Sequence, residues 1–265
     1  MEVNADYYPP HHLLLITHYP LSTTHYLPCS LLRSASLRKA FGDGIGDMGM
    51  DLDGLGYLAV PASGEGPGVI VLQEWWGLVP HIKTVADRFA EAGYVALAPD
   101  LYDGESTTSP DEAGRKMMAL NMEKTARSLE TAIGYLLNLE AVNQPQVGVV
   151  GFCMGGQLAL LAATVSDRIG ATVDFYGIHP NIQPNFSKLS APVLGLFGAQ
   201  DNLVPLEAVE GLVAAAKSAG ATIETQMYAS AGHAFFNDTR PEAYNAAAAE
   251  DAWDQTLTFF QTHLA

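Results

Sequence analysis

The segment from Val147 to Leu160 constrains the fold more than any other part of the sequence. It starts as a run of valines and glycines, passes through Cys153 and continues as an apolar helical stretch. A buried strand that bends sharply into a helix needs glycine on both sides of the bend, because a Cβ there would clash with the strand or the helix. Gly151 and Gly155 meet this requirement. The segment therefore predicts a tight strand-to-helix turn that presents a cysteine.

Short apolar runs alternate with helical periodicity from about residue 56 onward. We expect strands at 57–60, 68–73, 94–98, 146–150, 171–176, 192–197 and 222–228. We expect helices at 82–90, at 111–139 with a possible break, at 154–166, at 205–219, and from about 239–242 to near the C-terminus. This alternation predicts an α/β fold, with a mostly parallel central sheet and helices on both faces.

The chain of 265 residues is long enough for one large domain, which we place at 51–265. Residues 1–50 mix His, Tyr, Pro and Ser without a sustained period, and we interpret them as a poorly ordered N-terminal extension. Hydrophobic residues make up 48% of the chain and charged residues 16%, a balance that favours well-covered layers over disorder.

Composition and motifs exclude several classes of function. The net charge of −16 would repel nucleic acid, and no apolar run approaches the ~20 residues that span a bilayer. Two cysteines cannot form a disulfide framework, so we expect a cytoplasmic protein. The glycines at 44, 46 and 49 match a dinucleotide motif without its strand and helix, and no metal-binding motif occurs. We therefore expect no cofactor and no metal.

Cys153 has the surroundings of a nucleophile. At the N-terminus of a helix, the positive end of the helix dipole and the free N–H groups favour a thiolate. A free cysteine is more often a small buried apolar residue, and that alternative applies here too. The strand before Cys153, the flanking glycines and the following helix favour the nucleophile.

A thiol nucleophile needs a base, and the base needs a group that orients it. Asp201 follows the strand expected at 192–197, and His233 follows the strand expected at 222–228. Open α/β sheets build their sites at the carboxyl ends of strands, and the order Cys, Asp, His is the one that accompanies this turn. We predict that His233 is the base and Asp201 its orienting group. The alternatives are a structural loop histidine and a surface turn residue.

The other seven histidines are less suitable. Four lie within the first 25 residues, and His263 lies near the C-terminus. We expect His81 and His179 to be surface residues in a loop or at a helix start.

Five segments of the sequence are similar to signature segments of the dienelactone hydrolase family. They are Gln73 to Gly77, Pro99 to Tyr102, Gly151 to Gly156, Gly198 to Asp201 and Gly232 to Phe235. They occur in the family's order, and the resemblance extends from about residue 56 to the C-terminus. It implies a cofactor-free cysteine hydrolase with the α/β-hydrolase fold, expected to be a monomer, that acts on small esters or lactones.

The resemblance also implies roles for three further residues. Glu74 matches a glutamate that contacts the resting thiol and helps to switch the cysteine between protected and reactive states; the alternative is an ordinary loop carboxylate. The oxyanion hole would be formed by the backbone N–H groups of Trp75 and Met154.

The sequence departs from the family at two positions that hold a substrate carboxylate. Arginines are expected there, and this chain has Asp103 and Asn237. We therefore expect an uncharged or weakly polar substrate, although Arg240, Arg115 or Lys116 could compensate. We also predict an aromatic wall that binds this substrate; the alternative is that its members pack in the core. The wall consists of Trp76, Tyr102, Tyr176 and Phe235, together with Trp75 and Phe236.

Two other classes of function remain to be weighed. A binding or regulatory protein that kept the fold and lost the chemistry is the main alternative, because a fold does not guarantee a function. A metal-dependent hydrolase is disfavoured by the lack of a ligand motif. The complete order of Cys153, Asp201 and His233 favours the enzyme.

Overall fold

A computed structural model describes residues 49–177 and 179–264, which build one eight-stranded sheet. The strands lie in the order β1-β2-β4-β3-β5-β6-β7-β8. Their bounds are β1 Gly49–Leu52, β2 Gly56–Ala59, β3 Gly68–Leu72, β4 Val95–Pro99, β5 Val147–Phe152, β6 Ile169–Phe175, β7 Val193–Gly198 and β8 Ile223–Tyr228.

The sheet is parallel from β4 to β8, and β1 and β2 are added to it antiparallel. Strands β3, β4, β5 and β7 are buried along their whole length, which explains why their sequences are continuous apolar runs. β1 and β8 form the two edges, and the middle residues of β8 are exposed.

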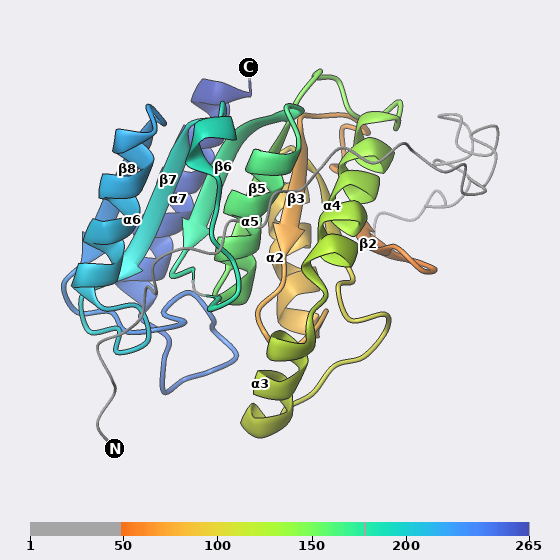
Figure 1. Cartoon of the computed structure of the whole chain (residues 1–265). Helices are drawn as coiled ribbons and strands as arrows, with labels where there is room; N and C mark the ends of the chain where they lie inside the picture. Colours follow the sequence, from red (N-terminus) through yellow and green to blue (C-terminus); the bar gives the residue numbers. More distant parts are fainter. Residues whose placement is uncertain (1–48, 178, 265) are drawn as a thin grey trace.

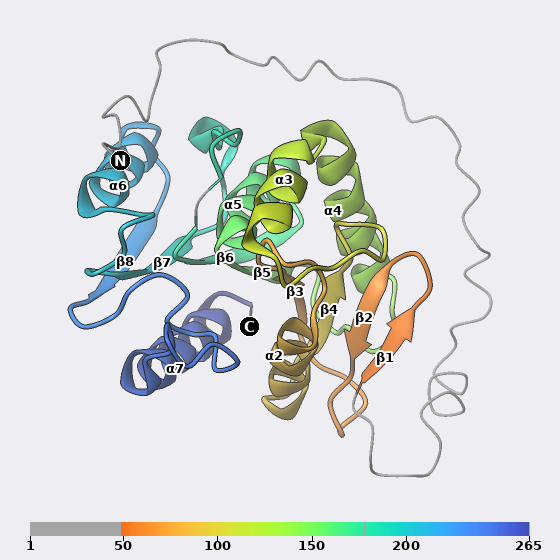
Figure 2. The ribbon, with the colours of Figure 1, turned by 90° about the horizontal axis from the view of Figure 1, so that it is seen from below.

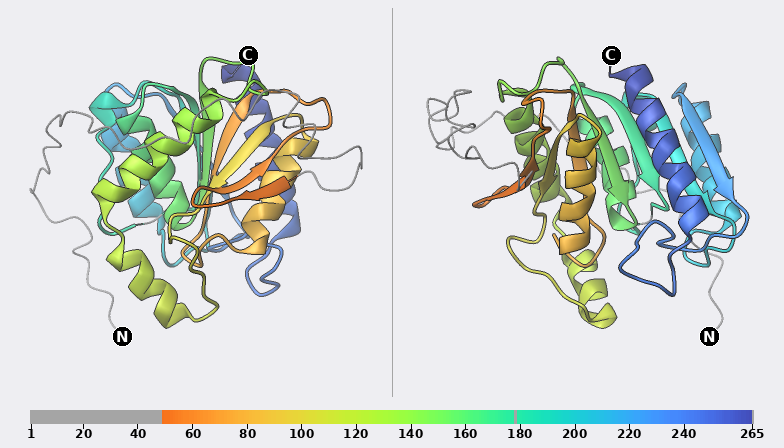
Figure 3. Two further views of the ribbon diagram at one scale, coloured as in Figure 1. Left: turned by 90° about the vertical axis from the view of Figure 1, so that its right-hand side faces the viewer. Right: turned by 180° about the vertical axis from the view of Figure 1, so that it is seen from behind.

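Helices cover both faces of the sheet (Figures 2 and 3). In Figure 2, α2 and α7 lie on one face, and α3, α4, α5 and α6 lie on the other. Their bounds are α2 Pro80–Glu91, α3 Pro110–Ala119, α4 Met122–Leu137, α5 Met154–Val165, α6 Leu206–Ser218 and α7 Ala246–His263, and a short 3-10 helix, η2, spans Phe186–Lys188. The arrangement confirms the predicted fold class.

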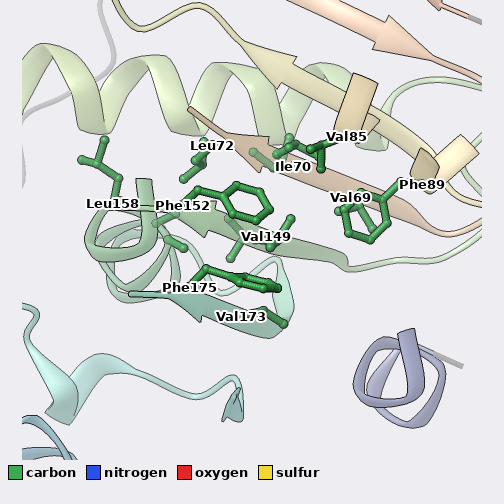
Figure 4. Packing of buried hydrophobic residues seen from close by; sticks show 14 of the residues in the cluster. Val69, Ile70, Leu72, Val85, Phe89, Val149, Phe152, Leu158, Val173 and Phe175 are labelled. Atoms are coloured by element: carbon green, nitrogen blue, oxygen red, sulfur yellow. The ribbon is translucent and has the colours of Figure 1, made fainter. Parts of the chain in front are cut away.

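The core lies between the sheet and the α2–α7 layer, and again between the sheet and α5. Phe152 and Phe175 are adjacent in register on β5 and β6, and their ring centroids are 4.7 Å apart (Figure 4). Phe236 packs on both rings from the loop before α7, with centroids 5.1 Å and 4.9 Å away. Since that loop also carries His233, burying these aromatic rings helps to fix the position of the histidine.

The structure resolves one open helix prediction and corrects another. The break left open within 111–139 is real, because α3 ends at Ala119 and the side chain of Asn121 accepts a hydrogen bond from the Lys124 N–H at the start of α4. The predicted start of the last helix near 239–242 is wrong, because α7 begins at Ala246.

The side chains that suggested a helix start at 239–242 make other hydrogen bonds and ion pairs instead. The Thr239 hydroxyl donates to Asn237 Oδ1 at 2.6 Å and does not cap a helix. Glu242 pairs with Arg240, and Asn245 provides the actual cap by accepting from Ala248 N–H.

The first strand was not predicted. β1 includes Gly49 and Met50, the last two residues of the segment that we interpreted as an extension, and it pairs with β2. Residues 1–48 lie outside the described residues, so the rest of that interpretation stays a prediction. In the described ranges, no helix is both long and apolar enough to cross a membrane.

Candidate active site

The predicted site residues gather at one edge of the sheet, where the parallel strands end. In Figure 1 the arrows of β6 and β7 point towards this lower edge. Glu74 follows β3, Tyr102 follows β4, Cys153 follows β5, and Asp201 and His233 follow β7 and β8. Parallel strands deliver their carboxyl ends to the same edge, which brings together residues that are far apart in the sequence.

Cys153 lies at the tip of the predicted turn and is the N-cap of α5. Its φ of 55° and ψ of −119° are a backbone conformation that residues other than glycine rarely adopt. The Cys153 N–H donates to the carbonyl oxygen of Phe175 on the neighbouring strand, which anchors the turn. The side chain is 6% exposed.

His233 and Asp201 are hydrogen-bonded to each other. His233 Nδ1 lies 2.8 Å from Asp201 Oδ2, and the other carboxyl oxygen of Asp201 accepts from the N–H groups of Leu203 and Val204. Because the carboxylate is held by backbone donors, it fixes the orientation of the ring. Among the described residues, His233 Nε2 has no hydrogen bond of normal geometry.

The charges of Cys153, His233 and Asp201 are strongly coupled. Burial lowers the pKa of His233, but the Cys153 thiolate and then Asp201 outweigh burial and raise this pKa to about 10. Burial raises the pKa of Asp201, yet the hydrogen bond and the charge of His233 leave that pKa below its usual value. Because both the charge of Cys153 and a hydrogen bond to it act on His233, the sulfur lies close to the His233 ring.

Glu74 is buried beneath this group. Burial raises the pKa of Glu74, and the hydrogen bond from Asn237 opposes the increase. Asn237 Nδ2 donates to Glu74 Oε2 at 2.7 Å, while Thr239 fixes the amide by donating to Asn237 Oδ1. The Tyr176 hydroxyl also lowers the pKa of Glu74, although within the described chain neither that hydroxyl nor the second oxygen of Glu74 has a hydrogen bond of normal geometry. A neutral amide is therefore the main donor to a buried carboxylate.

Replacing Asn237 with alanine should lower the free energy of unfolding by about 2 kcal/mol at pH 8.5, because Glu74 would lose its donor while buried. The loss should shrink at lower pH: without Asn237 the pKa of Glu74 rises further, and a protonated carboxyl needs no donor. Urea unfolding at pH 8.5 and pH 5 measures both values.

Asn138→Ala is the matched control for this change. The Asn138 side chain donates to the carbonyl oxygen of Gly134 on the surface, with no buried charge involved. We expect a loss under about 1 kcal/mol with no pH dependence. Equal losses in the two variants would contradict the role assigned to Asn237.

The predicted aromatic wall divides into two groups. Phe235 and Tyr176 are wholly buried; Phe235 packs against Tyr176 and Tyr228, with centroids 5.2 Å and 5.1 Å away, so core packing suits it better. Tyr176 also packs on the His233 ring at 5.1 Å, and its hydroxyl acts on Glu74 by lowering the pKa of that carboxyl. Tyr176 is therefore part of the site, whereas Phe235 supports it from behind.

Trp76 and Tyr102 lie nearer the surface of the site. The Trp76 ring contacts the Trp75 ring edge-on with centroids 5.0 Å apart. The Tyr102 hydroxyl donates to Met154 Sδ at 3.4 Å, and Tyr102 lines a cavity of about 300 Å³ between the loop after β4 and helices α3 and α4. Tyr102 thus separates this cavity from the turn at Cys153.

The two positions that depart from the family have different surroundings. Asp103 is exposed and forms an ion pair with Lys124 on the surface. Asn237 faces Glu74, as described above. Of the cations considered as replacements, Arg240 stands over the Trp76 ring at 5.4 Å and its charge lowers the pKa of Glu74, whereas Lys116 is paired with Glu105.

Two backbone N–H groups remain available beside the cysteine. Within the described residues, neither the Trp75 N–H nor the Met154 N–H donates a hydrogen bond. Helix α5 approaches β3 closely because residue 155 is glycine: a Cβ there would lie 2.4 Å from the Leu72 carbonyl oxygen and 2.5 Å from that of Gln73. This close approach brings the start of α5 next to the loop that carries Trp75.

The prediction that His81 and His179 are surface residues is wrong. Both are buried, and burial lowers the pKa of each. His81 Nδ1 lies 3.2 Å from Asp238, and His179 Nε2 lies 3.2 Å from the carbonyl oxygen of Met117, so each joins two segments. Nowhere in residues 49–177 and 179–264 do three His, Cys, Asp or Glu side chains form a group that could hold a metal ion.

Two features of buried polar residues near the site were not predicted: the partner of Asn237, and Asp174 altogether. The partnership of Asn237 with Glu74 joins residues 163 apart in sequence, and no local pattern indicates it. Asp174 was overlooked, although its signal was visible: it is a charged residue inside the apolar strand 171–176.

Comparisons with known proteins agree on the kind of protein this resembles. A family model described as the dienelactone hydrolase family matches residues 55–264. The chain is 35% identical over 216 residues to "Protein usf" of Aquifex pyrophilus, covering 79% of this chain and 93% of that protein. It is 35% identical over 222 residues to a putative carboxymethylenebutenolidase of Escherichia coli K12, covering 78% and 82%.

Solved structures are similar as well. The crystal structure of a putative dienelactone hydrolase from Klebsiella pneumoniae superimposes with a TM-score of 0.71 at 30% identity, covering 78% of this chain and 92% of that one. A dienelactone hydrolase-like promiscuous phosphotriesterase from metagenomic libraries superimposes with a TM-score of 0.72 at 23% identity, covering 79% and 92%, and that likeness concerns the fold alone.

Proposed function

This chain belongs to the dienelactone hydrolase family, and on that premise we propose that it is a cysteine-dependent hydrolase of small esters or lactones. The resemblance noted in the sequence is thereby confirmed at the level of the family and of its α/β-hydrolase fold. The observation that carries the proposal is the position of His233, whose Nδ1 is held by Asp201 while Nε2 remains free beside Cys153.

In the proposed reaction, the Cys153 thiolate attacks the carbonyl carbon of the ester and its electron pair forms the carbon–sulfur bond. The carbonyl oxygen takes up negative charge, which the N–H groups of Trp75 and Met154 stabilise. The tetrahedral intermediate collapses, and the proton on His233 Nε2 passes to the departing alkoxide. Water, deprotonated by His233, then attacks the thioester and releases the acid and the thiol.

Glu74 has a proposed regulatory part in this sequence. A carboxylate close to the thiol discourages formation of the thiolate, because like charges raise each other's pKa. The hydrogen bond from Asn237 holds Glu74 in place, and the charge of Arg240 favours its ionised form. Substrate that displaces the carboxylate would free the thiol to react.

We propose an uncharged or weakly polar substrate. Asp103 is paired with Lys124 on the surface, and Asn237 is a neutral amide committed to Glu74, so neither offers a cation to a carboxylate. Trp76 and Tyr102 offer aromatic surface to the acyl or ring part of a small ester. The free thiol suits a cytoplasmic, monomeric enzyme, which we include in the proposal.

A panel of p-nitrophenyl esters and small lactones, assayed during titration with iodoacetamide, tests this function. We expect turnover of short uncharged esters. The rate of hydrolysis should fall to zero as alkylation of Cys153 approaches one alkyl group per chain. Peptide mass spectrometry measures the alkylation of Cys153. Turnover that persists after complete alkylation of Cys153 would contradict the proposal. No turnover on any member would favour the alternative of a non-catalytic binding or regulatory protein.

A further inference from the structure

A buried carboxyl group lies behind the strand-to-helix turn and has no part in the reaction described above. Asp174 lies near the carboxyl end of β6 and is wholly buried. Neither of its carboxyl oxygens has a hydrogen bond of normal geometry among the described residues. Burying such a group without a partner costs folding free energy, so its presence calls for an explanation.

Asp174 occupies a slot lined by glycines. It lies beside Gly151 in the register of β5 and β6. A Cβ added to Gly156 or to Gly177 would lie 2.1 Å from Asp174 Oδ1, which shows that the carboxyl touches both backbones. Gly156 belongs to the first turn of α5, three residues after Cys153. The carboxyl and the sulfur therefore share one helix N-terminus.

We propose that Asp174 is a positioning residue for the nucleophile, and that ionisation of its carboxyl lowers the reactivity of the Cys153 thiol through the first turn of α5. The proposal rests on the proposed role of Cys153. The N–H groups at the start of α5 stabilise negative charge on the sulfur. A second negative charge against the same turn opposes the thiolate, whereas a neutral carboxyl leaves that stabilisation to the sulfur alone.

The charge of this group changes near neutral pH. Burial raises the pKa of Asp174 to about 7, and the backbone N–H of Gly177 acts in the opposite direction. Below pH 7 the carboxyl is neutral and does not restrain the thiol. Above pH 7 it becomes ionised and holds the thiol in a less reactive state.

Few other titratable groups surround Asp174. β5 and β7 carry none, and α5 carries none after its N-cap, Cys153. Helix α7 packs against β6 from the face of the sheet opposite α5, and its titratable residues are Glu250, Asp251, Asp254 and His263. Tyr176 and His179 follow β6, and the pKa of each is shifted by groups other than Asp174. Lys188 of η2, which packs against α5, is exposed. Cys153 is linked to Asp174 by geometry, because the carboxyl contacts Gly156 in the first turn of the helix that Cys153 caps.

The test is the rate at which iodoacetamide alkylates Cys153 between pH 5 and pH 9, read by peptide mass spectrometry in the full-length chain. Asp174→Asn should raise the rate about tenfold at pH 8, which corresponds to about 1.4 kcal/mol less electrostatic opposition to the attacking sulfur. At pH 5.5 the rate should match that of the wild type within about twofold, because the wild-type carboxyl is already neutral.

Thr172→Val is the matched control, since Thr172 lies on the same strand and face, is buried and has an unpartnered hydroxyl. Its alkylation curve should coincide with that of the wild type. An Asp174→Asn curve that also coincides with that of the wild type would overturn the proposal. So would a curve lower than that of the wild type by the same factor at every pH, because that is the result of a purely structural role.

If Asp174→Asn does not fold, Asp174→Ala removes the same charge and should give the same increase at pH 8; an unchanged or lowered rate would again overturn the proposal. The outcome is separable from the proposed function. Hydrolysis that survives in Cys153→Ala would contradict the function itself, whereas coincident alkylation curves contradict only the role of Asp174.

Discussion

Replacing Cys153 with alanine should lower kcat/KM for ester hydrolysis by a factor of about 10⁴ or more. The reason is that the sulfur forms the covalent intermediate, and the oxyanion donors and His233 alone leave only weak general-base catalysis by water. Stability should change little, because the substitution keeps the Cβ and removes only the sulfur of a small side chain. Steady-state kinetics and a thermal unfolding curve measure the two effects.

Cys29→Ala is the matched control for this loss. Cys29 is the other cysteine of the chain and lies outside the described residues. We expect full activity in that variant. Hydrolysis at the wild-type rate in Cys153→Ala would show that another group attacks the ester. A loss of activity that accompanies a loss of folded protein would show that Cys153 matters for the turn and not for the chemistry.

Replacing Gly151 with alanine should destabilise the fold by about 3 kcal/mol or more. A Cβ on residue 151 would lie 1.9 Å from the carbonyl oxygen of Gly155, and backbone cannot move aside as a flexible side chain can. Helix α5 would have to shift away from the end of β5, taking Met154 with it. We therefore expect a large drop in the urea midpoint, and activity lost from whatever protein still folds.

Gly211→Ala is the comparison that isolates the steric effect. Gly211 lies within α6, and a Cβ there meets no atom within 4 Å. Alanine is a better helix former than glycine, so we expect this variant to be stabilised by about 0.5 to 1 kcal/mol. Similar stability in the two variants would contradict the close approach of α5 to β5 at the turn.

Much of this architecture was predictable because the signals are local. A strand buried on both faces has to be apolar throughout, and β5 meets that condition, so its place inside a parallel sheet could be predicted. Glycine at 151 has a steric cause within the turn itself, because a Cβ there would meet the carbonyl oxygen of Gly155. The hydrogen bond between Asp201 and His233 followed from the rule that strand ends meet at one edge.

Other features depend on contacts that no local pattern reveals. His81 was expected at the surface because it begins a helix, but α2 carries it into contact with Asp238 from the loop before α7. The start of α7 was misplaced because the Thr239 side chain had two possible partners, and its bond with Asn237 prevails over a cap. β1 is short and only partly buried, so it lacks the apolar run of the central strands.

Within the described residues, β1 and β8 each have one edge that pairs with no further strand, and such rows of backbone N–H and C=O groups can recruit a strand from another molecule. Exposed Glu224 on β8 places a carboxylate along one of these rows. Two copies that approached edge to edge at neutral pH would be repelled by this carboxylate on each copy and by the net charge of −16 that each chain carries. Resistance to aggregation should weaken towards the isoelectric point of about 4.7, where the carboxylates begin to be neutralised.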